Sequence, residues 1–394
     1  MVKHNIVFVH QDAYITGSAI SLRNLIDGLD KDIFKIFVVA PIDGPAVNIW
    51  KEVGATVQIC FFYTFWTSPG PKCIGRSNIK QYRSLLPNRK LRQTIKGLNP
   101  SLVHINDKAA LQAGISLLNS GIPVIQHSRS AFHNTKCKIN KFVSSKIIPL
   151  YSDEIIAISE DEIQGFEKSK NLSVIYNTVN FSEVDTAINE SERLRNDLQI
   201  SGDEIVIGMA ENMSIHKGLL DIISIIDNFT SEQLQKVKFL LVGKFSEIDN
   251  LSSIGVNKSS KEYILEFIEK NNLQDKVILT GFQPKPLPYI AAMDIILVSK
   301  SHGVLGRQPI EAQALGTMVL AINGHSKKST LVQNSKGGYL MNSIEELTEK
   351  LLQLITNKDK IKEHGEMGRE YAKLNFDMMD YAKKITNIYL KYIN

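Results

Sequence analysis

The sequence is poor in cysteine and lacks any long apolar run. Only three of its 394 residues are cysteines, and they are scattered without the spacing of a zinc site or a disulfide framework. No stretch reaches the roughly eighteen apolar residues that a membrane-spanning helix needs. The N-terminus is typical of a first buried strand and not of a signal peptide. We therefore expect a cytoplasmic protein, either in solution or peripheral at the inner face of the membrane.

Acidic residues are missing between Val53 and Asn106, although the net charge of the whole chain is only +5. Basic residues and an aromatic cluster, Cys60–Trp66, fall in region 60–96. The basic residues are Lys72, Arg76, Lys80, Arg83, Arg89, Lys90, Arg92 and Lys96. Such a region suits contact with an anionic membrane surface. It equally suits a buried strand over 57–62 followed by a solvated basic loop and helix. Both interpretations remain open, and without a nucleic-acid-binding signature we expect no nucleic acid partner.

Short apolar runs alternate with helical patterns along most of the chain, which predicts βαβ units and parallel sheets. The polar segment Asn177–Gly202 interrupts this alternation, and a second series of strands and helices follows it. The length suits two domains. We predict an α/β fold of two Rossmann-like domains facing a cleft. Their expected limits are 1–178 and 179–374, with a C-terminal helix over 375–394 that crosses back to the first domain.

The stretch Ser299–Gly316 is typical of a phosphate-binding turn. An apolar run, Ile295–Val298, predicts a buried strand that Gly303 and Gly306 end. A helix should follow, because proline suits a first helical turn and Gly316 is placed to stop the helix. Such a turn aims free backbone N–H groups and a helix N-terminus outward, where a diphosphate can bind. An ordinary loop and helix fits the local pattern as well, so the rest of the chain must decide.

Several further motifs recur in a fixed order. The stronger ones are Ile207–Ala210 with Lys217-Gly218, Leu241–Gly243, Val277–Phe282, Asp294, Gly306-Arg307, Glu311–Gly316 and Gly337–Leu340. The weaker ones are Thr16–Leu22, Val103–Asn106, Val124–Arg129, Ile156–Ser159 and Val174–Asn177. In this order and spacing the chain resembles the family-4 retaining glycosyltransferases, which adopt the GT-B fold. The resemblance covers nearly the whole sequence and implies C-terminal helices that pack back toward the first domain.

The resemblance also implies roles for individual residues. Lys217 matches a lysine that contacts the donor diphosphate, where a cation stabilises charge on the leaving group. Glu311 matches a glutamate that accepts hydrogen bonds from the ribose. The backbone N–H groups of Val304, Leu305 and Gly306 would lie near the diphosphate or the sugar.

The first domain should contribute a glycine loop and a histidine. Gly17 and Ser18 resemble the family's first glycine loop, which lets the backbone approach the phosphates. His127 matches a histidine near the donor sugar, although a lone histidine is as often a structural hydrogen-bonding residue.

Three positions depart from the family pattern. Gly303 stands where the first glutamate of the family's Glu-x7-Glu pattern is usual. Asn212 stands where an arginine usually partners the lysine. The absence of this arginine removes roughly 1–3 kcal/mol of charge-assisted hydrogen bonding to the diphosphate. Lys328 stands where an acidic residue is common. These departures do not exclude sugar transfer. In the resembling enzymes the leaving phosphate deprotonates the acceptor hydroxyl, so no protein carboxylate has to attack.

The resemblance thus predicts an enzyme. We expect a retaining glycosyltransferase that moves a sugar from a UDP- or GDP-linked donor to a hydroxyl of a glycan or lipid-linked acceptor, in cell-surface polysaccharide or glycoconjugate synthesis. We expect neither a cofactor nor a metal, because no Asp-x-Asp triplet stands at a predicted strand end. The alternative is a catalytically weakened protein of the same fold that acts as a nucleotide-binding or scaffolding subunit.

Overall fold

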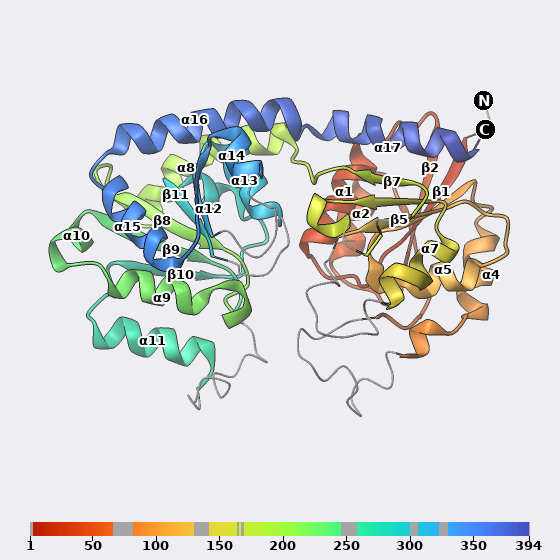
Figure 1. Ribbon diagram of the computed structural model, residues 1–394, viewed down its shortest axis with the longest axis horizontal. Coiled ribbons are helices and arrows are strands. Elements are labelled where there is room, and N and C mark those ends of the chain that lie inside the picture. Colours follow the sequence, from red (N-terminus) through yellow and green to blue (C-terminus); the bar gives the residue numbers. More distant parts are fainter. Residues whose placement is uncertain are drawn as a thin grey trace. The chain divides into compact units, whose positions relative to one another are not determined.

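The computed structural model describes residues 3–65, 82–129, 142–163, 165–166, 169–245, 258–299, 306–322 and 330–393. The chain divides into two compact units (Figure 1). Unit 1 contains Met1–Thr178 together with Met378–Asn394, and unit 2 contains Val179–Asp377. Each unit is a parallel sheet with helices on both faces. No helix of the described residues is long and apolar enough to cross a membrane.

Unit 1 is built on a seven-stranded parallel sheet with the order β3-β2-β1-β4-β5-β6-β7. The strands are β1 (His4–Val9), β2 (Phe34–Ala40), β3 (Thr56–Ile59), β4 (Leu102–Ile105), β5 (Val124–Ser128), β6 (Glu154–Ala157) and β7 (Leu172–Val174). The helices that cover it include α1 (Gly17–Gly28), α2 (Ala46–Glu52), α4 (Arg89–Gly97), α5 (Leu111–Leu117), α7 (Ile148–Tyr151) and α17 (Met378–Ile393). The strand order reverses between β1 and β4, which makes their shared edge the topological switch point of this sheet.

The two faces of this sheet bury different clusters because successive strand residues point to opposite sides. Leu102 and Ile125 pack on the face covered by α1, α2 and α17, whereas Val103 and Val124 pack on the face of α4 and α5. Helix α17 contributes four buried residues to the first face: Tyr381, Ile385, Ile388 and Tyr389. It lies so close to α1 that a Cβ on Gly28 would be 2.7 Å from the Cβ of Ala382. The predicted return of the C-terminal helix is therefore confirmed.

Unit 2 is built on a six-stranded parallel sheet with the order β10-β9-β8-β11-β12-β13. The strands are β8 (Ile205–Ala210), β9 (Val237–Val242), β10 (Val277–Gly281), β11 (Ile295–Val298), β12 (Met318–Ile322) and β13 (Gly338–Met341). The helices are α8 (Phe181–Asp197), α9 (Leu219–Asp227), α10 (Ser231–Gln235), α11 (Ser260–Lys270), α12 (Leu287–Ala291), α13 (Arg307–Leu315), α14 (Thr330–Ser335), α15 (Ile344–Leu354) and α16 (Lys358–Asn375). Its switch point lies between β8 and β11. The predicted α/β fold with two Rossmann-like sheets is confirmed.

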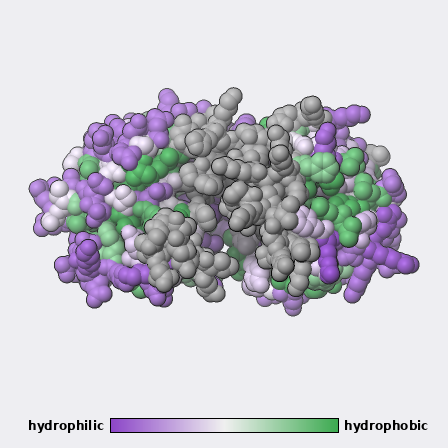
Figure 2. All heavy atoms as spheres, turned by 60° about the horizontal axis from the view of Figure 1, so that its bottom comes forward, coloured by the Kyte–Doolittle hydropathy of each residue, from purple (hydrophilic) through white to green (hydrophobic). Residues whose placement is uncertain are grey.

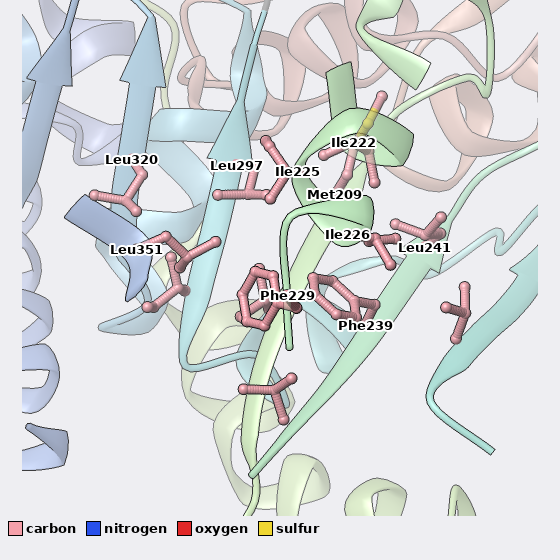
Figure 3. Packing of buried hydrophobic residues seen from close by; sticks show 14 of the residues in the cluster. Met209, Ile222, Ile225, Ile226, Phe229, Phe239, Leu241, Leu297, Leu320 and Leu351 are labelled. Carbon is pink, nitrogen blue, oxygen red and sulfur yellow. The ribbon is translucent and has the colours of Figure 1, made fainter. Parts of the chain in front are cut away.

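The core of unit 2 lies between this sheet and helices α9, α11 and α15. At its centre the rings of Phe229 and Phe239 meet edge to face with centroids 5.3 Å apart, surrounded by aliphatic side chains (Figure 3). Apolar strand residues such as Leu241 and Leu297 have almost no exposed surface. Burying such side chains supplies most of the stabilisation that holds the strand ends in place.

Helix α13 is held by close packing against α16. The helix ends at Gly316, which takes the left-handed conformation with φ +80° that favours glycine. A Cβ on Gly365 of α16 would lie only 2.0 Å from the Gly316 carbonyl oxygen, so glycine is required for this approach. Arg369 of α16 also donates to the Ala314 carbonyl at 3.0 Å. These contacts position the helix that carries Glu311.

Candidate functional site

A polar site lies at the switch point of unit 2, the edge where ligands bind in open α/β sheets. Glu211 and Asn212 follow β8, and a single helical turn (Ile215–Lys217) then leads through Gly218 into α9. Gly218 takes the left-handed conformation with φ +92°, and a Cβ there would be 1.7 Å from the Oγ of Ser299, which follows β11. The turn that carries Lys217 therefore packs directly against the end of the neighbouring strand.

Lys217 is paired with a carboxylate. Its Nζ lies 3.2 Å from Glu211 Oε2, with 38% of the lysine side chain and 17% of the glutamate side chain exposed. The backbone of Glu211 packs closely against Gly243 at the end of β9. A Cβ on Gly243 would lie only 1.8 Å from the Glu211 carbonyl oxygen. Met213 fastens the same segment by donating to the Lys244 carbonyl at 2.9 Å. Asn212, between them, is exposed.

A second cation and carboxylate meet at the start of α13. Arg307 donates from Nε and Nη2 to Glu311 Oε1 at 2.8 and 2.7 Å, and both side chains are nearly buried. Both bonds fall on one oxygen, and a carboxylate has a second oxygen to offer other donors. The pair fixes the orientation of the carboxylate one turn inside the helix. Gly306 precedes the helix in extended conformation.

Three of the sequence-predicted positions lie outside the described residues. These are Gly303, Val304 and Leu305, and Lys328 is outside them as well. Their proposed roles stay predictions.

The glycine loop of unit 1 lies at that sheet's own switch point. His10 follows β1 and Asn106 follows β4, and the Nδ2 of Asn106 lies 2.9 Å from Nδ1 of His10. The same amide donates to the Ser18 carbonyl at 3.1 Å, and Gln11 donates to the Ser18 hydroxyl at 2.9 Å. Gly17 begins α1 behind the N-cap Thr16. Ser18 is thus tied to the strand ends, directly after Gly17.

Arg129, which sequence reasoning missed, organises this edge. Its Nε donates to Asn106 Oδ1 at 2.9 Å and its Nη1 donates to Asn177 Oδ1 at 2.8 Å. Its Nη2 donates to the Tyr381 hydroxyl at 3.2 Å and to His127 Nδ1 at 3.4 Å. The side chain is 8% exposed, so these four neutral partners hold a buried cation. The sequence feature that could have indicated this role is the position of Arg129, a basic residue directly after the apolar strand β5.

His127 is buried within a group of histidines. His104 Nε2 lies 3.2 Å from His127 Nδ1, and neither residue has exposed surface. Burial, followed by the nearby charge of Arg129, lowers the pKa of both imidazoles well below the usual value. The same two causes lower the pKa of His10 to about 3. All three histidines are therefore neutral near pH 7. Among the described residues, His127 Nε2 has no hydrogen-bond partner.

Unit 1 also contains a buried ion pair. Lys108 Nζ is 3.6 Å from Glu162 Oε2, and the two side chains are 1% and 0% exposed. Burial lowers the pKa of Lys108, while the charges of Glu162 and Asp107 oppose the shift. The pair joins the segment after β4 to the segment after β6, so its role is to hold two strand ends together.

The residues that the sequence predicts for the site divide between the two units. Lys217, Asn212, Gly306 and Glu311 lie in unit 2, where two of them carry paired charges. Gly17, Ser18 and His127 lie in unit 1, linked through Asn106 and Arg129. Within the described ranges no cluster of three or more His, Cys, Asp or Glu residues could hold a metal ion.

Fold and sites together define a two-domain α/β protein with a polar site at each switch point. The model of family-4 glycosyltransferases matches residues 15–183, and the model of group 1 glycosyl transferases matches residues 190–373. Between them these matches cover most of the chain. The protein belongs to the family-4 (group 1) glycosyltransferases, as its motifs predicted.

Individual relatives are distant. The poly(ribitol-phosphate) α-N-acetylglucosaminyltransferase of Staphylococcus aureus is 26% identical over 133 residues, which is 33% of this chain and 27% of that protein. An uncharacterised glycosyltransferase of Methanocaldococcus jannaschii is 21% identical over 258 residues, 63% of this chain and 61% of the other. The chain thus matches less than two thirds of the length of these curated relatives. Among solved structures, Anabaena HepE in complex with UDP and glucose superimposes with a TM-score of 0.76 at 19% identity, covering 97% of this chain and 98% of HepE. This likeness confirms the GT-B type of fold.

Proposed function

We propose that the protein transfers a sugar from a nucleotide-sugar donor to an acceptor hydroxyl, with retention at the anomeric carbon. The observation that carries this proposal is the position of Lys217 and Glu311. The lysine follows β8 against the end of β11, and the glutamate lies in the helix that leads on from β11. A cation for a diphosphate and a carboxylate for ribose hydroxyls therefore belong to the switch point of one sheet.

We propose a UDP-linked donor. HepE, which has this fold, has been crystallised with UDP-glucose. The relative from S. aureus acts on a poly(ribitol-phosphate) chain, which supports a polymeric acceptor with free hydroxyl groups. Unit 1 would bind this acceptor. The limits 1–178, 179–374 and 375–394 remain our proposal for the domains.

Release of the donor's nucleotide tests the proposal. The whole chain is incubated with a panel of UDP- and GDP-sugars, with and without glycan acceptors, and free nucleotide is measured. We expect one donor to be turned over and Glu311→Gln to lower kcat/KM, because the ribose would lose a charged acceptor. If no donor is turned over although a nucleotide binds, the protein is a nucleotide-binding or scaffolding subunit and the transferase proposal fails.

We further propose that unit 1 contacts the inner membrane surface through the basic face of α4, defined as Arg89, Lys90 and Lys96. These three side chains are exposed, while Leu91 and Ile95 on the other side of the helix are buried. Large apolar residues are exposed near this face: Phe61 is 57% and Leu86 is 61% exposed. Apolar and hydrophilic patches lie side by side on the described surface of the protein (Figure 2). Basic charge beside exposed apolar groups suits anionic lipid.

The aromatic cluster contributes less to this surface than its composition indicates. Cys60, Phe62 and Phe65 are buried in the core, and β3 ends at Ile59, before them. Trp66 lies outside the described residues. Of the basic residues, Arg92 is turned inward and donates to the Ser116 carbonyl at 2.8 Å. The membrane proposal therefore rests on charge, with few exposed aromatic rings.

Sedimentation with vesicles tests the membrane proposal. We expect the protein to bind vesicles that contain anionic lipid, more weakly as salt rises, and the Arg89→Ala, Lys90→Ala double variant to bind less. Arg92 is left intact because it caps the end of α5. The matched control removes two exposed charges from α11, Lys261→Ala with Lys270→Ala. Equal binding by the two double variants would refute the proposed surface.

A further inference from the structure

Three buried side chains form a hydrogen-bonded chain from the C-terminal helix to His127. The Tyr389 hydroxyl of α17 lies 2.7 Å from His104 Nδ1, and His104 Nε2 lies 3.2 Å from His127 Nδ1. The register explains the contact. His104 of β4 is opposite Ile125 of β5, so His104 and His127 point to the same face, the one that α17 covers.

The direction of these bonds follows first from the tyrosine. Burial raises the pKa of Tyr389 well above its usual value, so its hydroxyl keeps the proton. Among the described residues, His104 Nδ1 is the one hydrogen-bond partner of that hydroxyl. If Tyr389 accepted a proton from His104, its own buried O–H would have no acceptor, which is costly. Tyr389 therefore donates to Nδ1, and neutral His104 carries its proton on Nε2.

The direction follows independently from Arg129 at the other end of the chain. A guanidinium can only donate, and its Nη2 reaches His127 Nδ1 at 3.4 Å. His127 Nδ1 must then accept, both from Arg129 and from His104 Nε2. Neutral His127 carries its single proton on Nε2. The two ends of the chain require the same arrangement of protons.

We propose that Tyr389 and Arg129 are positioning residues that hold His127 as the Nε2–H tautomer, so that it donates a hydrogen bond to an oxygen of the transferred sugar. His127 Nε2 is buried and has no partner among the described residues, as expected of a donor kept for a ligand. In this state His127 is not a general base. The inference about the sugar rests on the proposed function, whereas the inference about the tautomer does not.

The same logic applies to His10 across the switch point. Arg129 Nε donates to Asn106 Oδ1, which fixes the orientation of that amide. Its Nδ2 must then donate to His10 Nδ1, so that neutral His10 also carries its proton on Nε2. This proton faces Asp12, whose Oδ1 is 3.8 Å away. One arginine thereby sets two histidines of this edge in the same tautomer.

Nuclear magnetic resonance of histidines labelled with ¹⁵N tests the tautomers without any substrate. We expect long-range ¹H–¹⁵N spectra of the whole chain to show protonated Nε2 and unprotonated Nδ1 for His104 and His127, assigned with His127→Asn. In Tyr389→Phe the unprotonated Nδ1 of His104 loses its hydrogen-bond donor, so its signal should shift away from the protonated range, while Arg129 keeps the tautomer. The matched control is Tyr392→Phe, which removes a hydroxyl from the same helix that contacts Glu154 and no histidine.

Two results would overturn the inference. One is a wild-type spectrum in which His127 is protonated on Nδ1, which needs no variant to be folded. The other is a Tyr389→Phe spectrum of a folded protein that matches that of Tyr392→Phe.

Activity provides a second readout for the role of the proton. Glutamine places an amide N–H near the position of Nε2, whereas asparagine does not reach it. We expect His127→Gln to keep about 3- to 10-fold more kcat/KM than His127→Asn, the value of one hydrogen bond. Equal loss in both would refute the donor role of His127. If the wild-type protein has no transferase activity, the proposed function fails, and the spectra still decide the tautomer.

Discussion

Lys217 Nζ lies 3.2 Å from Glu211 Oε2, and Glu211 belongs to the segment that stands where related enzymes carry an arginine. If Lys217 binds the donor diphosphate as we propose, the chain lacks one of the two cations that the family resemblance implies and places a carboxylate beside the other. A bound diphosphate would share Lys217 with Glu211. Donor affinity then depends on how strongly this carboxylate screens the lysine.

Replacing Glu211 by glutamine should tighten nucleotide binding. The neutral amide keeps the shape of the side chain and removes a negative charge next to the phosphates, so we expect the Kd for UDP to fall by about 2- to 10-fold. Isothermal titration calorimetry measures the change. The matched control is Glu232→Gln, which breaks another lysine–glutamate pair, with Lys236, and should not alter the Kd. Weaker binding by Glu211→Gln would mean that Glu211 positions the lysine and does not compete for it.

Replacing Arg307 by alanine should reduce discrimination at the ribose. Two hydrogen bonds from Arg307 hold Glu311 Oε1, and without them the carboxylate loses its fixed orientation. We expect the preference for UDP over 2′-deoxy-UDP to shrink to less than about 3-fold, whereas Lys217 still binds the diphosphate. Arg193→Ala is the control, since this arginine forms an exposed pair with Asp197 at the same helical spacing. An unchanged preference in Arg307→Ala would argue against Glu311 as the ribose acceptor.

Gly243 should be sensitive to a single added methyl group. Its φ is +153°, and a Cβ would lie 1.8 Å from the Glu211 carbonyl oxygen, a backbone atom that cannot rotate away. Gly281, at the end of the neighbouring strand, has φ +69° and open space around it. We expect Gly281→Ala to cost roughly 1–2 kcal/mol from backbone conformation alone. Gly243→Ala should cost more and also weaken UDP binding. Urea unfolding and calorimetry measure both, and equal costs would contradict the packing.

His10 should make the protein sensitive to acid. Burial and the charge of Arg129 lower the pKa of its imidazole to about 3 in the folded state, against 6.5 in the unfolded chain. Protonation therefore favours unfolding. The stability that neutral His10 provides is complete above pH 6.5 and is lost as the pH falls toward 3. Between pH 7 and pH 5 the free energy of unfolding should fall by up to about 2 kcal/mol more in wild type than in His10→Asn.

Urea titrations at the two pH values measure this difference. Half-buried Asp12 next to His10 has a pKa that burial raises and acts in the opposite direction, so the comparison with His10→Asn isolates the histidine. If the free energy of unfolding changed equally with pH in the two proteins, the pKa of His10 would not be lowered by folding.

The architecture can be predicted from sequence periodicity, because strands and helices follow from local patterns of apolar residues. Short apolar runs separated by helices predict both sheets, and the family resemblance singles out Lys217 and Glu311. The charge partners of these two residues, Glu211 and Arg307, were not predicted. Pairing depends on side-chain directions, such as the approach of Gly243 to the Glu211 backbone, which no local pattern contains.

The network in unit 1 was beyond sequence reasoning for a similar reason. It joins His104 to Tyr389, which is 285 positions away in the chain, and the contact needs both the strand register and the return of α17. For the aromatic cluster, the sequence left an exposed and a buried interpretation open. Cys60, Phe62 and Phe65 follow a sheet-edge strand and turn into the core, so composition alone overstates the exposed aromatic surface.

The central claim is that the switch point of unit 2 binds the diphosphate of a nucleotide sugar. Calorimetric titration of the whole chain with UDP and with GDP tests it most directly, using Lys217→Ala as the variant and Lys236→Ala, at the opposite edge of the sheet, as the control. We predict that one nucleotide binds, that Lys217→Ala weakens it by about 10- to 100-fold, and that Lys236→Ala leaves it unchanged. Absence of binding by both nucleotides, or equal binding by Lys217→Ala and wild type, would contradict the claim.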